Sequence, residues 1–352
     1  MRRVVIVGHI CVDITPGLLA TTRIEPGRLF EVGALAMSLG GCVANTGGDL
    51  ADLGLPVRVH TAVGDDELGS IVTRLIAQRP GMVGPPLVVT GANTSYSLVL
   101  EPPGVDRTFW HHTGANDRFD GTTVPLESCD LMHLGYPPLL PGLLVDHGAP
   151  LVALLERARA AGVTTSIDLA VVDRDSPTGR LDWDRILRRM ASATDVLSPS
   201  LDDLTSALGI DESPGTALVS RLADQLIAWG AAVVMLSSGS GGLFLRTGSR
   251  ERLAAGGSAL SGLSELWADV RLEIPPVPVP DAVTTNGAGD AATAGLLYSI
   301  AAGIGPQEAG TIASACSAAV IAGRPTTIDT LLELRPDLAS VLTVDPGGYP
   351  VR

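Results

Sequence analysis

The segment "TTNGAGD" (284–290) combines residue types suited to chemistry on an anion. Asp290 directly follows Gly287, Ala288 and Gly289 and stands at the start of an apolar stretch of helical length. A helix N-terminus attracts anions because its first N–H groups are unpaired and its dipole is positive there. Glycines let the backbone approach a ligand closely. Asp290 is therefore either a cap of the helix or a base beside a bound phosphate group.

A second set of polar residues lies near the N-terminus. Asp13 comes just after the apolar run "RVVIVG" (3–8), and Gly40 and Gly41 precede a predicted helix that contains Asn45. Each of these residues alone is equally compatible with a loop, a turn or a helix cap. Carboxylate and amide groups can also bond to neighbouring hydroxyls of one ligand. Together with Asp290, the set indicates phosphoryl transfer, which needs a base for the attacking hydroxyl and donors for the transferred charge.

Strands and helices alternate along most of the chain. Predicted strands cover 3–8, 57–64, 130–134, 163–168, 195–197 and 232–237, and predicted helices cover 45–54, 66–78, 151–161, 181–190, 215–229, 288–302 and 306–322. This alternation predicts an α/β fold in one domain (1–352), with a doubly wound, mostly parallel sheet and helices on both faces. Ligands of such sheets bind at the carboxyl ends of the strands, where the glycine turns are expected.

Two segments, 12–38 and 88–112, interrupt the alternation. They read as strands without a following helix, with "TSYSLVLE" and "DRTFWHH" around the turn "PPGV", and predict a small antiparallel lid. Exposed apolar edges of such a lid favour a homodimer formed by strand pairing. His111 and His112 are adjacent in a predicted strand and point to opposite faces, so they cannot hold one metal together. Residues 248–280 form a weakly patterned excursion rich in Pro and Gly.

Composition and short motifs exclude several classes of function. The chain has 24 basic and 38 acidic residues and a net charge of -14, which argues against nucleic acid or an anionic membrane as partner. It contains no Lys, so a Schiff-base enzyme and a Gly-Lys-Ser/Thr phosphate loop are excluded. A Gly-x-Ser-x-Gly elbow is absent, and Ile10 and Asp13 replace glycines of a dinucleotide fingerprint. Four cysteines without a Cys-x-x-Cys spacing, and a start that does not read as a signal peptide, favour reduced thiols and the cytoplasm.

Taken together, these motifs resemble the ribokinase-like (PfkB) carbohydrate kinase family over most of the chain. The N-terminal signature is similar to "GGCVAN" followed by "GDDELG", and the C-terminal signature is similar to "TTNGAGD". The segments "HHTGAN", "HLGYP", "VLSPSLDD" and "VVMLSSGSGG" resemble the family's middle part. The resemblance implies a Rossmann-like, ribokinase-like fold and an ATP-dependent kinase that phosphorylates a hydroxyl of a sugar or sugar-like molecule with Mg²⁺.

The resemblance also implies a role for each candidate residue. Asp290 matches the catalytic base, and Gly287, Ala288 and Gly289 match the anion hole. The residues implied to contact the substrate are Asp13, Gly40, Gly41, Asn45, Arg107 and Asn116. Those implied to lie beside the nucleotide are Ser200, Ser237, Gly239, Gly242 and Asn286. Asp203 is expected to attract the metal ion through water.

Four departures from the family pattern change what we expect of metal binding, potassium dependence and the substrate. Ser200 and Asp203 replace the usual Asn-x-x-Glu, so Mg²⁺ is expected to be retained by a shorter carboxylate. Thr284 replaces an Asp that helps bind a monovalent cation, which predicts weak or absent potassium dependence. Gly135 and Cys42 replace a Glu and a Lys usual in ribokinases proper, which disfavours ribose as the substrate.

Two alternative functions stay open at this point. One is a nucleoside kinase of the same family, in which Phe109 and Trp110 form a wall that stacks on the nucleobase. The other is a degenerate member that binds a sugar or a nucleotide without turnover, an alternative prompted by Ser200, Asp203 and Thr284.

Overall fold

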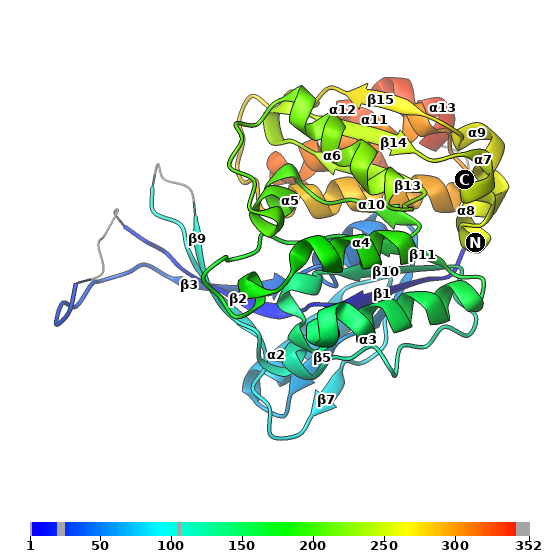
Figure 1. Ribbon diagram of the computed structural model, residues 1–352. Coiled ribbons are helices and arrows are strands. Elements are labelled where there is room, and N and C mark those ends of the chain that lie inside the picture. Colours follow the sequence, from blue (N-terminus) through cyan, green and yellow to red (C-terminus); the bar gives the residue numbers. More distant parts are fainter. Residues whose placement is uncertain (1, 20–24, 104–106, 343–352) are drawn as a thin grey trace.

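The computed structural model describes residues 2–19, 25–103 and 107–342, and its largest feature is a mixed, mostly parallel sheet (Figure 1). Within the described residues this sheet has nine strands in the order β15-β14-β13-β12-β11-β10-β1-β4-β6. The strands are β1 (Val4–Gly8), β4 (Val57–His60), β6 (Met82–Val83), β10 (Leu131–Gly135), β11 (Thr164–Ile167), β12 (Val196–Leu197), β13 (Val233–Ser237), β14 (Leu243–Thr247) and β15 (Arg271–Ile274). The antiparallel pairs within it are β13 with β14 and β14 with β15, so β14 runs opposite to its neighbours.

The interior strand β1 shows why the sheet is covered on both faces. Val4 and Ile6 pack into one hydrophobic cluster, and Val5 and Val7 pack into another. Successive side chains of a strand point to opposite faces, so a continuous apolar run needs apolar layers on both sides. The two clusters are those layers, which confirms the predicted α/β class.

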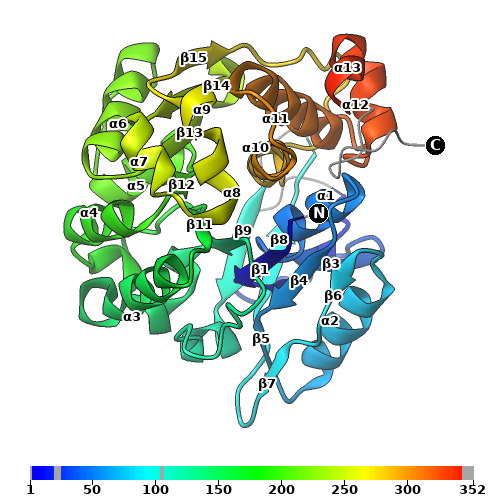
Figure 2. The same cartoon turned by 90° about the vertical axis from the view of Figure 1, so that its right-hand side faces the viewer.

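Helices form both outer layers. In Figure 2, α1, α2, α10 and α11 lie on one side of the sheet and α3 to α6 on the other. The first layer comprises α1 (Asn45–Asp52), α2 (Glu67–Gln78), α10 (Ala288–Ala302) and α11 (Pro306–Ile321), followed by α12 (Ile328–Leu334) and α13 (Ala339–Leu342). The second comprises α3 (Pro141–Ala160), α4 (Trp183–Ala193), α5 (Leu201–Leu208) and α6 (Thr216–Ala228). In the part of the chain that is described, no helix is both long and apolar enough to cross a membrane.

A smaller sheet, here called the lid sheet, projects from the main body (Figure 1). Its strands run in the order β3-β2-β8-β9 and are β2 (Cys11–Pro16), β3 (Leu35–Gly40), β8 (Tyr96–Leu100) and β9 (Thr108–His112). The pairs β3–β2 and β8–β9 are antiparallel, as predicted for the lid, whereas β2 and β8 run parallel to each other. Residues 20–24 and 104–106, which include the second half of the "PPGV" turn and the first residue of "DRTFWHH", lie outside the described residues.

Several predicted boundaries differ from the structure. The strand predicted over 57–64 is divided between β4 in the main sheet and β5 (Ala62–Gly64), which pairs with β7 (Leu87–Val89). Residues 88–89 therefore belong to β7 and not to the lid sheet. The excursion 248–280 contains the short helices α7 (Arg250–Ala254), α8 (Gly257–Leu260) and α9 (Ser264–Trp267) and the edge strand β15. Helices of four or five residues are too short to give a helical hydrophobic period.

Candidate active site

Asp290 lies at the start of α10, inside a cleft of about 1690 Å³. Gly287 precedes the helix with a φ of 79°, a left-handed conformation that favours glycine. Within the described residues, the hydrogen bonds to the Asp290 carboxylate come from outside its own helix. Asn45 Nδ2 donates over 3.0 Å and Thr46 Oγ1 over 2.9 Å. The carboxylate is thus oriented toward α1 and is not the cap of α10.

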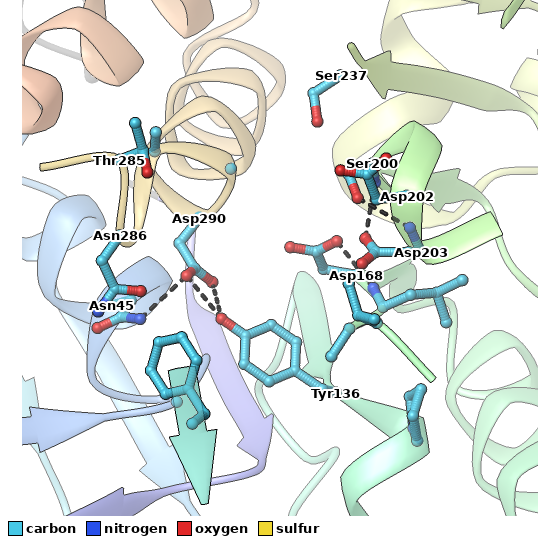
Figure 3. Close-up of a pocket in the computed structure, with 18 of the residues that line it drawn as sticks. Asn45, Tyr136, Asp168, Ser200, Asp202, Asp203, Ser237, Thr285, Asn286 and Asp290 are labelled. Atoms are coloured by element: carbon cyan, nitrogen blue, oxygen red, sulfur yellow. Dashed lines mark hydrogen bonds between the residues drawn. The ribbon is translucent and has the colours of Figure 1, made fainter. Parts of the chain in front are cut away.

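The hydroxyl of Tyr136, just after β10, also donates to Asp290, at 2.5 Å from Oδ1 and 2.6 Å from Oδ2 (Figure 3). Burial raises the pKa of Asp290, and the hydrogen bonds from Tyr136, Asn45 and Thr46 oppose that increase. Sequence reasoning missed Tyr136, although it stands in the quoted segment "HLGYP". Its role depends on a contact across 154 positions of the chain, which no local pattern encodes.

The expected acceptor residues converge on one end of the cleft. Asp13, Gly41 and Asn45 all line it. Two glycines make this packing possible: a Cβ on Gly40 would lie 2.4 Å from the Asp13 carboxylate, and one on Gly41 would lie 2.5 Å from His9 Nδ1. Gly40 is therefore a spacer beneath Asp13, and Gly41 forms the wall of the cleft.

The residues assigned to the nucleotide line the same cleft, with Ser200 and Ser237 across it from Asn45 and with Asn286 beside Asn45 (Figure 3). They are Ser200, Ser237, Gly239, Gly242 and Asn286. Gly239 has a φ of 49°, and a Cβ there would meet no atom within 4 Å, so this turn is open. Ligand sites typically enclose roughly 300–1000 Å³, so this cleft is larger than the site of a single small ligand.

Ser200 and Asp203 also have a structural role as the capping box of α5. Asp203 N–H donates to Ser200 Oγ over 3.0 Å, and Ser200 N–H donates to Asp203 Oδ2 over 2.8 Å. The acidic first turn is therefore a cap, and its residues line the cleft as well. Burial raises the pKa of Asp203 to about 6.

Asp168, which follows β11, is a third buried carboxyl in the cleft and was not predicted as a site residue. In the view of Figure 3 it lies between Asp290 and Asp203. Burial raises its pKa well above the ordinary value, and the charges of Asp290 and Asp203 raise it further. Three buried carboxyls that disfavour one another's charge fit a divalent cation with oxygen ligands, such as Mg²⁺. A carboxylate at the carboxyl end of the strand predicted over 163–168 was the signal that could have identified Asp168.

The other predicted residues are placed as follows. Arg107 lines the cleft, and its Nη1 donates to Thr285 Oγ1 over 2.8 Å, so the lid sheet contacts the "TTNGAGD" turn. Asn116 differs from the expectation, since it is not among the described residues that line the cleft. It is fully buried, and its Nδ2 donates to the carbonyl of Ile10 over 3.0 Å. Asn116 therefore holds the loop between β1 and β2 in place. Ala288 and Gly289 line the cleft, with Gly287 directly beneath them in the turn.

Solved structures with the same fold support the assignment of the architecture. The ribokinase of Arabidopsis thaliana, complexed with ribose and ATP, has a TM-score of 0.71 at 19% identity, covering 95% of this chain and 99% of that chain. The nucleoside kinase of Methanocaldococcus jannaschii has a TM-score of 0.70 at 16% identity, covering 96% and 99%. The nucleoside kinase of Burkholderia thailandensis, in complex with inosine, has a TM-score of 0.66 at 18% identity, covering 99% and 100%.

The amino-acid sequence assigns the chain to a family, which the similarity of fold alone does not do. Residues 1–331 match the family described as "pfkB family carbohydrate kinase". That range includes β1 at one end and most of α12 at the other, together with every candidate residue of the cleft. On this match over nearly the whole length, the chain belongs to the pfkB family of carbohydrate kinases.

Proposed function

We propose that this protein is an ATP-dependent kinase, acting as one folded unit, that phosphorylates a hydroxyl of a sugar or sugar-like molecule. The observation that carries the proposal is the position of Asp290. Its buried carboxylate lies between the open first turn of α10 and the polar group of Asp13 and Asn45, inside one cleft.

In the proposed reaction, Asp290 takes the proton of the acceptor hydroxyl while that oxygen forms a bond to the γ-phosphorus. The bond from the γ-phosphorus to the bridging oxygen breaks, and ADP leaves with the bond's electron pair. The amides of Ala288 and Gly289 stabilise the transferring charge, because the first N–H groups of a helix lack partners within it. Asp13 and Asn45 orient the acceptor, which places its hydroxyl for in-line attack.

Mg²⁺ is proposed to bind beside Asp168 and Asp203, the latter through water. When bound, the ion neutralises phosphate charge that the acidic cleft would otherwise repel. The fit rests on the donor set, since buried carboxylate oxygens are the ligands that hard cations prefer. Thr284 remains the basis for expecting weak potassium dependence.

The test is coupled ADP release over a panel of pentoses, hexoses, ketoses and nucleosides, with Asp290→Asn as the inactive control. Removal of the base is expected to lower kcat by about 10²–10⁴-fold and to leave ATP binding near wild type. Asn has nearly the shape of Asp, so a calorimetric titration with ATP distinguishes loss of chemistry from loss of fold. Activity of Asp290→Asn close to wild type would refute the assigned base.

A nucleoside kinase is the second candidate, favoured by the wall of the cleft at β9. Phe109 lines the cleft, and the Arg107 guanidinium lies 5.5 Å from the centroid of its ring. A nucleobase can stack on such an aromatic face. Nucleosides in the panel decide between the two candidates. Binding without ADP release across the whole panel would instead indicate a non-catalytic binder.

We also propose that two copies of the chain dimerise through the lid sheet. The register places Met37, Ile14, Leu98 and Trp110 in one row across the face opposite Asp13. Met37 is 40% exposed and Trp110 is 47% exposed. An apolar sheet face of this kind is commonly covered by a partner.

A further inference from the structure

The lid sheet carries a row of polar side chains on the face toward the cleft. Strand register places Asp13 opposite Ser97, and Ser97 opposite His111. Residues directly opposite one another point to the same face of a sheet. His112 points to the other face, where its ring centroid lies 5.4 Å from that of Tyr96. The predicted opposite orientation of His111 and His112 agrees with this register, and it is His111 that lines the cleft.

Two residues from another part of the chain meet His111 at this face. His9 follows β1, and its Nε2 lies 3.3 Å from His111 Nε2. Cys11 begins β2, and its Sγ and the two imidazoles each offer one ligand atom, all within 4.8 Å of one another. His9 and Cys11 are each only 2% exposed, and all three residues line the cleft.

We propose that His9 Nε2, His111 Nε2 and the Cys11 thiolate bind a divalent transition-metal ion of the Zn²⁺ type. Two nitrogens at about 2.0–2.1 Å from a tetrahedral ion lie about 3.3–3.4 Å apart, which is the separation found here. Nitrogen and sulfur ligands of one such ion lie about 3.6 Å apart, so the sulfur has to approach by about 1.2 Å at most. A rotation of the Cys11 side chain covers that distance.

Ser97 contacts two of the three proposed ligands. Ser97 Oγ lies 3.1 Å from His111 Nδ1 and 3.7 Å from Cys11 Sγ, so it can orient both ligands. Burial lowers the pKa of His9, lowers that of His111 to about 4, and raises the pKa of the Cys11 thiol well above its ordinary value. The Cys11 thiol loses its proton when the ion binds.

This site differs in chemistry from the proposed Mg²⁺ site. Imidazole and thiolate are ligands for borderline and soft ions, whereas Asp168 and Asp203 offer only hard oxygens. The Asp13 carboxylate lies 3.3 Å from Cys11 Sγ and can supply a fourth ligand. On the proposed function, Asp13 also contacts the acceptor, so the bound ion is expected to inhibit turnover in competition with the acceptor. That consequence rests on the proposed function, and metal binding does not.

The experiment is a titration of the full-length, reduced protein with Co²⁺ in the absence of nucleotide, followed by absorption spectroscopy. The expected result is one Co²⁺ per chain, with a thiolate-to-cobalt charge-transfer band in the near ultraviolet and intense visible bands of a tetrahedral site. Cys11→Ser is expected to abolish the charge-transfer band. Ser97→Ala, which removes an outer-shell partner, is expected to weaken binding about 10–100-fold, and His111→Gln by more.

Matched controls are His112→Gln, on the opposite face of the strand that carries His111, and Cys129→Ser, in the hydrophobic core just before β10. Both are expected to bind Co²⁺ as wild type does. A wild-type protein without the tetrahedral spectrum contains a plain histidine pair and overturns the proposal, as does a charge-transfer band that persists in Cys11→Ser. Should Cys11→Ser not fold, alkylation of Cys11 in the wild type decides: Zn²⁺ must slow it, and an unchanged rate overturns the proposal.

Discussion

At the scale of single residues, Tyr136 controls the acidity of the proposed base. Its phenol donates to both oxygens of Asp290 and so stabilises the ionised carboxylate. A hydrogen bond to a charged group contributes about 1.5–3 kcal/mol, or about one to two pKa units. Tyr136→Phe is therefore expected to raise the pKa of Asp290. The acidic limb of the pH profile of kcat/KM then moves to higher pH by about one to two units.

The control for this prediction is Tyr96→Phe, since Tyr96 packs against His112 on the far face of the lid sheet. Its acidic limb should match the wild type. A Tyr136→Phe profile that keeps its midpoint while losing amplitude would mean that Tyr136 only shapes the cleft and does not tune the base.

Gly289 tests the anion hole independently of the base. A Cβ at this position would meet no atom within 4 Å, and the residue lines the cleft. Gly289→Ala therefore leaves the fold intact and places a methyl group where the phosphoryl oxygens are proposed to bind. We expect a loss of kcat of about 10–100-fold, with a melting temperature near that of the wild type.

Gly262→Ala is the matched control, since a Cβ there also meets no atom within 4 Å and the residue is remote from the cleft-lining set. Equal kinetics for the two variants, measured by coupled ADP release, would contradict the proposed position of the phosphoryl group.

Some site residues were predictable because their signal is local. The adjoining glycines and the apolar helix that follows them identify Asp290 as a candidate site residue. In the structure Asp290 lines the cleft. Tyr136 and Asp168 have no such neighbours. Their roles arise because β10 and β11 lie side by side in the sheet, so that their carboxyl ends open into the same cleft. Strand order is a property of the whole fold, and one-dimensional patterns do not contain it.

Among the elements, the lid sheet has two chemically different faces because side chains alternate along its strands. Asp13, Ser97 and His111 face the cleft, and Met37 and Trp110 face away. If the outward face holds a second copy, a charge there prevents association, because it would be buried without a partner. Trp110→Glu is expected to convert a dimer into a monomer in sedimentation velocity runs at micromolar concentration.

Val83→Glu is the control for surface charge, since Val83 is 61% exposed on the edge strand β6, which is not part of the lid sheet. It should sediment like the wild type. A wild-type protein that sediments as a monomer at high concentration would rule out the proposed assembly.

The elements themselves were predictable where hydrophobic periods are long. Helices α10 and α11 and strands β1 and β13 lie within two residues of their predicted positions. The strand β14 was not predicted, although it is buried along its length and pairs with β13. Its five residues follow a glycine turn directly, and a short apolar run of that length does not distinguish a strand from part of a helix.

For the molecule as a whole, the ionisation of buried carboxyls opposes folding. The chain has a net charge of -14, and burial raises the pKa of Asp168 and Asp203, and that of Asp49 to about 7. A carboxyl whose pKa is higher in the folded state stabilises the fold at low pH. That contribution is lost as pH rises through the raised pKa. The protein without ligands should therefore gain stability as pH falls from about 8 toward 5.5.

The variant Asp168→Asn tests whether the same buried carboxylate destabilises the protein without ligands and binds the proposed Mg²⁺. At pH 8 the variant removes a buried charge and keeps a carbonyl oxygen as acceptor for Leu169 N–H, which donates to Asp168 over 2.8 Å. Its melting temperature without Mg²⁺ is expected to exceed that of the wild type. The difference in melting temperature should vanish as pH falls toward the ordinary carboxyl pKa of about 4.

Mg²⁺ should stabilise the wild type more than the Asp168→Asn variant, and the variant should need more Mg²⁺ for turnover. The exposed Asp281→Asn controls for net charge. A variant that is less stable than the wild type at pH 8, yet equally responsive to Mg²⁺, would show that Asp168 is a structural acceptor and that the cation binds elsewhere.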